Sequence, residues 1–243
     1  MKIVIMTTSY NAEKYISRCI KSVKSQTYTN YIMVITDDLS TDNSVSVVKE
    51  AIKDDARFRL IENTSKLYAA GNHKQIGDLL EVSNDDILVC LDGDDWFYDN
   101  NVLARVVNYY NNPNILMSFG QFVHWDGKNI YPGFTKSPLS WDVRNVPWTT
   151  SHLKTFRAGV LKKVNVSDLQ ITPNNFFPMA GDLAIIYPML EMVGPNRVLF
   201  TNDINLVYNC ENVNNEYKIN LQLQDKCANM IRRRQPYSYV EVF

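Results

Sequence analysis

Three aspartates within four residues, Asp92-Gly93-Asp94-Asp95, form the strongest chemical signal in this chain of 243 residues. They directly follow the apolar run Ile87-Leu88-Val89-Cys90-Leu91, which predicts a buried strand. Carboxylates gathered at a strand end repel one another, and a cation offsets that repulsion. Hard oxygen ligands of this kind favour Mg²⁺ or Mn²⁺, which also bind phosphate oxygens. The alternative is a solvated acidic turn that caps a helix beginning near Asn100.

Two further polar clusters follow apolar runs of the same kind. Asp37-Asp38 ends one run, and Thr8 and Tyr10 follow the run that opens the chain. A carboxylate in such a place can accept a hydrogen bond from a nucleobase N–H, while a hydroxyl and an aromatic ring can line the rest of the pocket. The alternative for Asp37-Asp38 and the residues after it is a helix N-cap, for which Ser40 or Asp42 is suited in either case.

The segments around these clusters alternate between short apolar runs, which are typical of buried strands, and segments whose apolar residues have helical spacing. Apolar runs predict strands at 3–6, 31–36, 58–62 and 87–91, and helical spacing predicts helices at 16–26, 45–52 and 69–82. This alternation favours an α/β fold with a mostly parallel sheet, right-handed crossovers and flanking helices. Ligands of such sheets bind beyond the carboxyl ends of the strands, so we expect the three polar clusters to meet in one crevice.

The second half of the chain is less regular. We predict helices at 101–110, 183–192 and 218–234, and strands at 115–125, 155–161 and 198–208. Pro188 is expected to bend the helix that contains it or to mark an early break. We assign 1–215 to a single domain with halves 1–100 and 101–215, and 216–243 to a C-terminal helical tail.

Composition and charge exclude several classes of protein. Lys and Arg total 25 against 26 Asp and Glu, and a net charge of -1 gives no electrostatic footprint for nucleic acid. No apolar run approaches the roughly 20 residues that a membrane span needs, so we expect no transmembrane segment. The opening apolar stretch is too short for a signal peptide. We therefore expect a soluble, cytoplasmic protein whose four scattered cysteines are reduced thiols.

The motifs and their order resemble those of family 2 inverting glycosyltransferases with the GT-A fold. That family's pattern is an apolar strand, Thr/Pro-x-Tyr-Asn, a helix, Ser-x-x-x-Gln, a second apolar strand and Asp-Asp-Gly-Ser-x-Asp. The corresponding segments here are Thr8-Ser9-Tyr10-Asn11, Ser22-Val23-Lys24-Ser25-Gln26 and Asp37-Asp38-Leu39-Ser40-Thr41-Asp42. Asp92-Gly93-Asp94-Asp95 matches the DxDD metal motif, and Gly181-Asp182 resembles the later Gly-Glu/Asp element. The resemblance covers residues 1–210.

The resemblance implies a GT-A fold in which 1–100 bind the nucleotide and 101–215 the acceptor. It implies a metal-dependent, inverting transfer of a hexosyl group from a nucleotide sugar, in the first instance a UDP-sugar, to a hydroxyl of a glycan or other acceptor. By the same resemblance Thr8, Tyr10 and Asp38 contact the base, with the register between Asp37 and Asp38 left open. Asp92 and Asp94 hold the ribose and a Mn²⁺ or Mg²⁺ ion, and Asp95 is a further candidate for the metal.

Asp182 is implied as the base that removes the proton of the acceptor hydroxyl. Its neighbours Met179, Ala180 and Leu183 are apolar, so we expect partial desolvation and a raised pKa for its carboxyl group. The alternative is a simple helix N-cap.

Two residues of the second half are candidates for the acceptor site. Trp148 can stack on a sugar ring, and His152 lies where related enzymes bring acceptor-site residues near the base. The alternatives are a tryptophan that fills the core and a structural histidine.

The chain departs from the family pattern at two positions. Leu39 replaces the usual glycine of the second motif, and Gly71 of Ala70-Gly71-Asn72 stands where the family often has arginine. Lys66, His73 or Lys74 are the candidates to supply the missing positive charge. A C-terminal Gln-x-x-Arg-Trp motif is absent, which argues against a polymerising synthase.

Two other functions remain as alternatives. One is a non-catalytic GT-A-like module that only binds its ligand, which the two departures keep open. The other is a sugar nucleotidyltransferase, but such enzymes carry a glycine-rich phosphate loop after the first strand, and Thr7–Asn11 contains no glycine.

Overall fold

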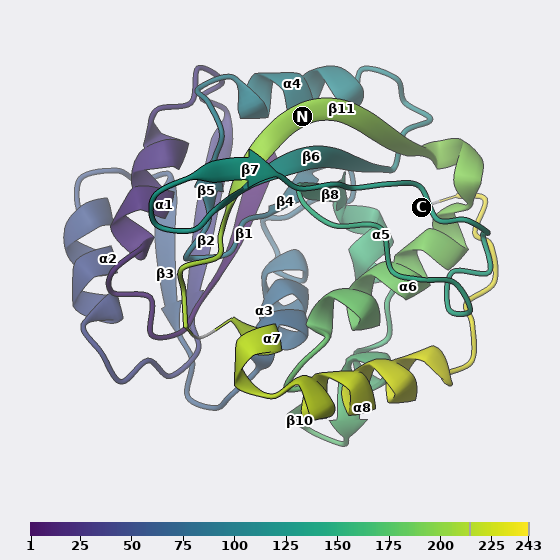
Figure 1. Ribbon diagram of the computed structural model, residues 1–243. Coiled ribbons are helices and arrows are strands. Elements are labelled where there is room, and N and C mark those ends of the chain that lie inside the picture. The colour runs from purple at the N-terminus through teal and green to yellow at the C-terminus, as the bar shows by residue number, and fades with distance from the viewer. Residues whose placement is uncertain (214, 243) are drawn as a thin grey trace.

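The first half of the protein alternates strands and helices as its hydrophobic periods predict (Figure 1). The structure is a computed structural model, and it describes residues 1–213 and 215–242. The elements in chain order are β1 (Ile3–Ser9), α1 (Ile16–Lys24), β2 (Tyr31–Asp37), α2 (Ser44–Ile52), β3 (Phe58–Glu62), α3 (Tyr68–Gly77) and β4 (Ile87–Cys90). The burial of side chains follows the predicted helical spacing. For example, α1 buries one face, which contains Ile16, Cys19, Ile20 and Val23, and leaves the opposite face to solvent.

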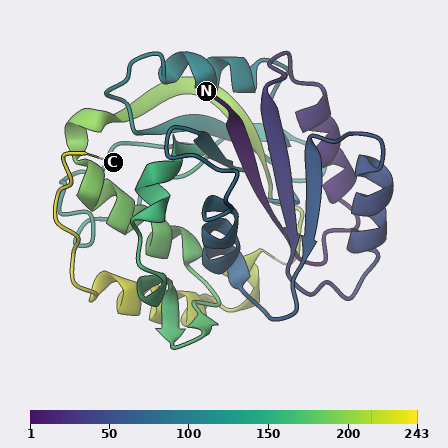
Figure 2. The ribbon, with the colours of Figure 1, turned by 180° about the vertical axis from the view of Figure 1, so that it is seen from behind.

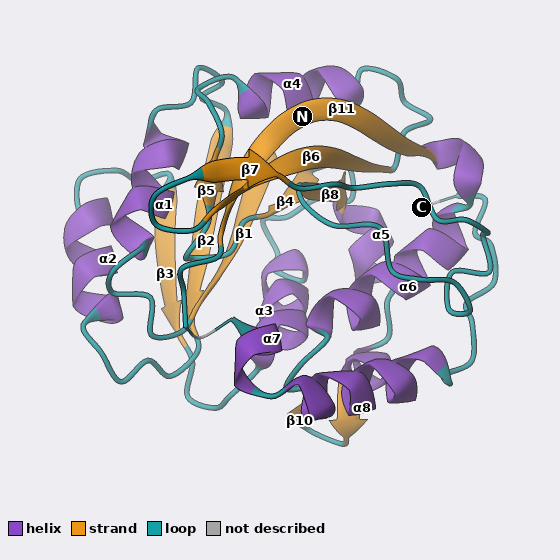
Figure 3. Ribbon diagram, viewed as in Figure 1, coloured by secondary structure: helices purple, strands orange, loops and turns teal. Residues whose placement is uncertain are grey.

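The second half contains shorter elements separated by longer loops. They are β5 (Trp96–Phe97), α4 (Val102–Tyr109), β6 (Met117–Trp125), β7 (Ile130–Pro132), β8 (Lys154–Arg157), α5 (Ala158–Lys162), β9 (Gln170–Thr172), β10 (Asn175–Phe176), α6 (Gly181–Val193), β11 (Val198–Asn209), α7 (Glu216–Ile219) and α8 (Leu221–Arg232), with 3-10 turns at Val166–Leu169 and Pro195–Arg197. Figure 3 shows the long loop between β7 and β8, which crosses the molecule without regular structure.

The main sheet has the strand order β3-β2-β1-β4-β8-β6-β11-β5, with β7 paired to β6. The predicted parallel arrangement is confirmed for β3, β2, β1 and β4. Beyond β4 the sheet is mixed, because β8 runs antiparallel to both β4 and β6, whereas β11 is parallel to β6. The strand β8 therefore lies in the middle of the sheet, between the two halves of the chain.

Helices cover both faces of the sheet (Figures 1 and 2). Ile3 and Ile5 of β1 belong to a core cluster shared with α1, α2 and α4. Val4 and Met6, the alternate residues of the same strand, belong to a second cluster shared with α3, α5, α6 and α8. Successive side chains of a strand point to opposite faces, so this fully apolar strand supplies both cores.

The carboxyl ends of β1, β2 and β4 meet at one edge of the sheet. Ser9 is paired with Asp37 in the register between β1 and β2. Beyond the end of β4, the Gly93 N–H donates to the Thr8 carbonyl at 2.9 Å. A Cβ atom at position 93 would lie 3.0 Å from that carbonyl oxygen, so a glycine permits this close approach. The acidic loop, Asp92-Gly93-Asp94-Asp95, is thereby held against the end of β1.

Two element predictions need correction. The segment 155–161 is not one strand: β8 ends at Arg157 and α5 begins at Ala158, a change that a continuous apolar run does not reveal. The tail helix is interrupted at Asn220, whose side chain accepts from the Leu223 N–H and caps α8. The helix predicted at 183–192 is confirmed, since α6 continues through Pro188 to Val193. Of the tail 216–243, residue 243 lies outside the described residues.

Across 1–213 and 215–242, no helix combines the length and the apolar character needed to cross a membrane.

Candidate active site

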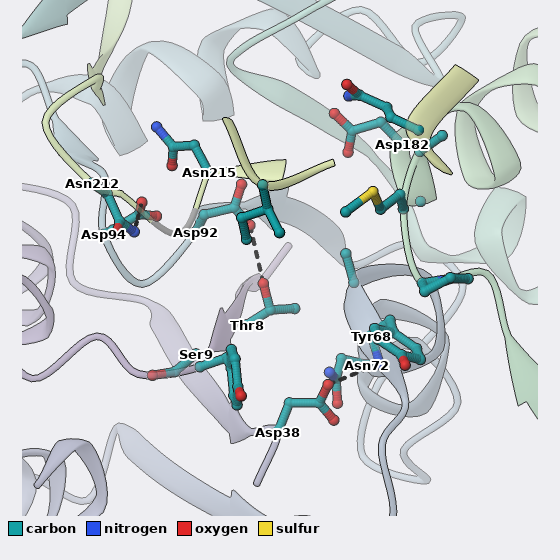
Figure 4. A pocket seen from close by; sticks show the side chains of 18 of the residues that line it. Thr8, Ser9, Asp38, Tyr68, Asn72, Asp92, Asp94, Asp182, Asn212 and Asn215 are labelled. Atoms are coloured by element: carbon teal, nitrogen blue, oxygen red, sulfur yellow. Dashed lines mark hydrogen bonds between the residues drawn. The ribbon is translucent and has the colours of Figure 1, made fainter. Parts of the chain in front are cut away.

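A cavity of about 510 Å³ opens at the edge of the sheet where β1, β2 and β4 end (Figure 4). Its walls come from the loops after these strands, from the start of α3, from the start of α6 and from the segment after β11. Its volume is within the roughly 300–1,000 Å³ range of small-molecule sites. The three polar clusters that the sequence places at strand ends meet here.

Asp38 is the member of the Asp37-Asp38 pair that lines the cavity. Its carboxylate accepts the backbone N–H groups of Leu67 and Tyr68, each at 2.9 Å, and the side-chain amide of Asn63 at 2.8 Å. These donors come from the segment that leads into α3, so they fix the carboxylate against the wall of the cavity.

Asp37 is buried beside Asp38, and its carboxylate stabilises the turn that follows β2. Its Oδ2 atom accepts the Ser40 N–H at 3.0 Å, and the residue is not part of the cavity wall. The register that the sequence leaves open therefore places Asp38 at the cavity and Asp37 behind it. Asp42 lies one residue before Asn43, the N-cap of α2, and its Oδ1 atom accepts the N–H of Ser44, the first residue of the helix.

Tyr10 and Lys66 form the outer part of the same wall. The Lys66 ammonium lies 3.1 Å from the centroid of the exposed Tyr10 ring, and it donates to the Asp38 carbonyl at 2.7 Å. Burial lowers the pKa of Lys66, against the opposing effect of Asp38. Of the three cations considered from the sequence, only Lys66 lines the cavity. The Lys74 ammonium group donates hydrogen bonds to Asp78 and to carbonyls of α5.

The third candidate, His73, is buried beneath the cavity, and burial lowers the pKa of its imidazole ring. A histidine with a lowered pKa is neutral at pH 7 and supplies no positive charge.

Asp92 and Asp94 both line the cavity, next to Thr8. The Thr8 hydroxyl donates to Asp92 Oδ1 at 3.1 Å, and the Asn212 side-chain amide donates to Asp94 Oδ2 at 2.7 Å. Burial, together with the nearby charge of Asp92, raises the pKa of Asp94 to about 6. The pair is thus an electrostatically unfavourable arrangement that a cation would relieve.

These two carboxylates fit a divalent ion that is shared with a phosphate ligand. Within the part of the chain that the structure describes, no group of three or more His, Cys, Asp or Glu side chains is arranged to hold a metal by itself. Mg²⁺ and Mn²⁺ at phosphate-transfer sites commonly take one or two protein carboxylates and fill their other positions with water and phosphate oxygens. Asp92 and Asp94 match that donor set.

Asp95, which the sequence also offers as a metal ligand, is not part of the cavity wall. It is 1% exposed, and its Oδ1 atom accepts the Asn209 N–H at 2.8 Å. Burial and the charges of Asp94 and Asp92 raise its pKa well above the usual value. Its position attaches the acidic loop to the end of β11, so a direct role at a metal ion would require the side chain to turn.

Asp182 lines the cavity at the first turn of α6, across from Asp94 (Figure 4). Its Oδ2 atom lies 2.7 Å from the Nζ atom of Lys154, which projects from β8. Burial alone would raise the pKa of Asp182, but the charge of Lys154 and the ring of His152 outweigh it and the pKa is lowered. The expectation of a raised pKa is therefore wrong, because Lys154, which is distant in sequence, supplies a charge that the apolar sequence neighbours of Asp182 do not indicate.

Trp148 and His152 come from the loop between β7 and β8, and both line the cavity. The Trp148 ring meets Tyr187 of α6 edge-on, with 5.5 Å between centroids. The His152 ring stacks on Tyr208 at 5.1 Å, and burial followed by the nearby Lys154 lowers its pKa to about 4. His152 is therefore neutral at pH 7, and both rings face the same space as Asp182.

Comparison with known proteins agrees with this geometry. The family model described as glycosyl transferase family 2 matches residues 4–172, which is more than two thirds of the chain. The chain belongs to glycosyl transferase family 2. An uncharacterized glycosyltransferase of Haemophilus influenzae is 32% identical over 124 residues, which are 51% of this chain and 48% of that protein. The chain thus spans about half the length of this curated relative.

Solved structures show that the chain has the GT-A fold. Residues 1–349 of S. aureus TarS, in a complex with UDP-GlcNAc, align with a TM-score of 0.69 at 15% identity, over 95% of this chain and 65% of that chain. The mannosyltransferase PcManGT of Pyrobaculum calidifontis, in a complex with GDP-Man and Mn²⁺, aligns with a TM-score of 0.61 at 18% identity, over 89% of this chain and 58% of that chain.

The two departures from the family pattern have local structural explanations. Leu39 adopts the left-handed conformation, with φ of 65°, so the turn keeps the geometry that a glycine would give it. At Gly71 a Cβ atom would lie 2.9 Å from ring carbons of Phe176 in β10. In this member of family 2 an aromatic ring thus fills the space over position 71.

Several cavity residues were not identified from the sequence. Asn72, Tyr208, Asn212 and Asn215 line the cavity, and Lys154 lies behind Asp182. A signal for Lys154 was present, because a lysine between Leu153 and Thr155-Phe156 in an apolar strand is expected to need a buried carboxylate partner. The asparagines of the segment after β11 carry no comparable sequence signal.

Proposed function

We propose that the protein is a metal-dependent inverting glycosyltransferase that moves a hexosyl group from a nucleotide sugar to a hydroxyl group of a glycan or other acceptor. The donor is proposed to be a UDP-sugar. The observation that carries this proposal is that one cavity is lined by Asp38, by Asp92 and Asp94, and by Asp182 on the side across from Asp94 (Figure 4). The UDP-GlcNAc bound by TarS and the Mn²⁺ bound by PcManGT support the choice of donor and cofactor.

The nucleobase would lie between Tyr10 and Asp38. A carboxylate has about four lone-pair sites, and Asp38 accepts three donors from the protein, so it retains capacity for one N–H of a base. Lys66 adds a donor beside it that suits a base carbonyl. A uracil ring presents this combination of one N–H between two carbonyls.

The diphosphate would lie beside Asp92 and Asp94, which would hold the divalent ion with it. A bound Mn²⁺ or Mg²⁺ stabilises the negative charge that develops on the leaving diphosphate. Thr8 and Asn212 orient the two carboxylates through the hydrogen bonds described above.

Asp182 would take the proton of the acceptor hydroxyl as that oxygen attacks the anomeric carbon. The new carbon–oxygen bond forms while the bond from the anomeric carbon to the diphosphate breaks, so a single displacement inverts the anomeric centre. The lowered pKa keeps Asp182 ionised at neutral pH, which is the state that a general base requires. Trp148 and His152 line the space in which the acceptor would bind.

Thermal unfolding with nucleotides tests the donor site. UDP, GDP and dTDP would be compared with and without Mn²⁺. A ligand at 100 times its dissociation constant stabilises by about 2.7 kcal/mol, which is roughly 5–10 °C for a domain of this size. We expect a Mn²⁺-dependent shift with UDP that is lost in Asp94→Asn. The absence of any shift would favour the non-catalytic alternative.

Donor hydrolysis tests the base without requiring a known acceptor, because water can replace the acceptor hydroxyl. Asp182→Asn should lower the rate of UDP-sugar hydrolysis about 10²–10⁴-fold and leave the UDP shift intact. The matched control is Asp225→Asn, the same change on the exposed face of α8. Full activity of Asp182→Asn would contradict the assigned role.

A further inference from the structure

Lys154 is a buried cation in the middle of the sheet. It is the first residue of β8, which lies between β4 and β6, and its side chain is 3% exposed. Among the described residues its Nζ atom has one hydrogen-bond partner, Asp182 Oδ2 at 2.7 Å. Removing an ammonium group from water costs several kcal/mol, so a lysine at this place calls for an explanation.

Stability alone explains Lys154 poorly. A buried ion pair is often no more stabilising than apolar side chains of the same volume. The two partners also differ in their surroundings, because the Asp182 side chain is 40% exposed and opens into the cavity. The positive charge therefore lies behind a carboxylate that faces the ligand space, where its field acts on that carboxylate.

The contacts of Asp182 show what the lysine leaves available. Lys154 engages Oδ2, and within 1–213 and 215–242 no protein group donates a hydrogen bond to Oδ1. One oxygen is thus anchored while the other remains free for a ligand. The first turn of α6 adds a favourable dipole for the negative charge.

We propose that Lys154 is the positioning residue of Asp182: it fixes Oδ2, keeps the carboxylate ionised and directs Oδ1 toward the acceptor hydroxyl. This inference rests on the proposed function, since it concerns the same base.

The other groups that act on Asp182 cannot replace Lys154. Lys154 and His152 come from β8 and the loop before it, and His73 comes from α3. Cys90 and Asp92, at the end of β4, act on Lys154. Burial lowers the pKa of both histidines, so neither is charged at neutral pH. Burial raises the pKa of the Cys90 thiol, which therefore stays neutral, and Asp92 carries a like charge. Lys154 is the cation of this group, and Asp182 raises its pKa further.

The direction in which the pKa of Asp182 would move without Lys154 follows from these contacts. Without Lys154, the largest effect that lowers the pKa of Asp182 is lost, while burial still acts to raise that pKa. The base would then be protonated over a wider acidic range, and its activity would fall at a higher pH. It would also lose the contact that fixes its orientation.

Lys154→Met tests the inference, because methionine has a similar length and no charge. The pH dependence of UDP-sugar hydrolysis would be measured at saturating Mn²⁺, together with UDP affinity. We expect the acidic limb of kcat to move up by at least one pH unit, and kcat on the alkaline plateau to fall about tenfold. UDP affinity should remain unchanged, and Lys154→Arg should restore the acidic limb in part. Lys226→Met on the exposed face of α8 is the matched control.

The titration of the Asp182 side chain, followed by ¹³C NMR, gives a readout that does not depend on activity. We expect its pKa to rise by at least one unit in Lys154→Met. If that variant does not fold, Lys154→Gln, which keeps a hydrogen-bond donor without the charge, takes its place in both measurements. An unchanged Asp182 titration and an unchanged pH profile would overturn the inference.

The outcomes separate this inference from the proposed function. If Asp182→Asn abolishes hydrolysis but Lys154→Met keeps the wild-type pH profile, the base assignment stands and the role of Lys154 is wrong. If the wild-type protein neither binds nor hydrolyses any nucleotide sugar, the proposed function fails first.

Discussion

At the scale of single residues, Leu39 shows how the chain keeps a glycine turn without a glycine. Its φ of 65° places a branched side chain in a region that costs an L-residue roughly 1–2 kcal/mol. Glycine removes this cost but loses about 0.5–1 kcal/mol through the greater entropy of the unfolded chain. Leu39 is exposed, so little apolar burial is lost. Leu39→Gly should therefore stabilise the protein by about 0.5 kcal/mol in urea unfolding.

The control is Leu80→Gly, at a fully exposed leucine that does not have a positive φ. This substitution should cost about 0.5–1 kcal/mol. Equal losses in the two variants would show that the backbone conformation of Leu39 carries no strain.

The residues of the candidate site fall into two groups: those at the ends of the parallel strands, and those whose role depends on the position of β8. Thr8, Asp38, Asp92 and Asp94 were predictable because each directly follows an apolar strand of the parallel half, and such strand ends meet. For Lys154 the sequence indicates a buried carboxylate partner but not which one, because its contact with Asp182 depends on the insertion of β8 between β4 and β6. The same fact explains why the direction of the Asp182 pKa shift was predicted wrongly.

At the scale of elements, hydrophobic periodicity predicted the parts of the fold that depend on local pattern. The first four strands and three helices were predicted in the correct order, because each has a single clear period. The division of 155–161 between β8 and α5 was not predictable, since a short apolar run fits a strand and a buried helix equally well. The break of the tail at Asn220 depends on a capping hydrogen bond that periodicity does not record.

The packing of α3 against β10 gives a testable prediction at this scale. A Cβ atom at Gly71 would lie 2.9–3.0 Å from ring carbons of Phe176, closer than packed atoms approach. Overpacking of this kind costs about 1–3 kcal/mol, whereas alanine in a helix gains about 1 kcal/mol over glycine. Gly71→Ala should therefore destabilise the wild-type protein by about 1 kcal/mol in urea unfolding.

The Phe176→Leu background reverses the expected sign, because the smaller side chain makes room and leaves only the helix propensity of alanine. Gly71→Ala should stabilise that background by about 0.5–1 kcal/mol. The same effect in both backgrounds would show that Phe176 does not limit the size of residue 71.

At the scale of the whole molecule, the acidic loop makes stability depend on pH. The pKa of Asp94 is raised from 3.8 to about 6, so the folded state binds this proton more tightly than the unfolded chain does. A raised carboxyl pKa lowers stability as the pH rises through this interval, and the loss is complete at neutral pH. Asp94→Asn removes the charge and keeps an acceptor for the Asn212 amide.

Asp94→Asn should therefore be more stable than the wild type at neutral pH, by about 1–3 kcal/mol or several degrees in Tm. The difference should shrink as the pH falls below about 6 and disappear only well below pH 3.8, where Asp94 is protonated in both states. Asp225→Asn should show no such dependence. A loss of stability in Asp94→Asn at neutral pH would contradict the electrostatic account.

In the wild type, Mn²⁺ with UDP should recover this stability at neutral pH and do less at pH 5, because protons compete for Asp94. The destabilising charge and the proposed ligand site would then be the same feature.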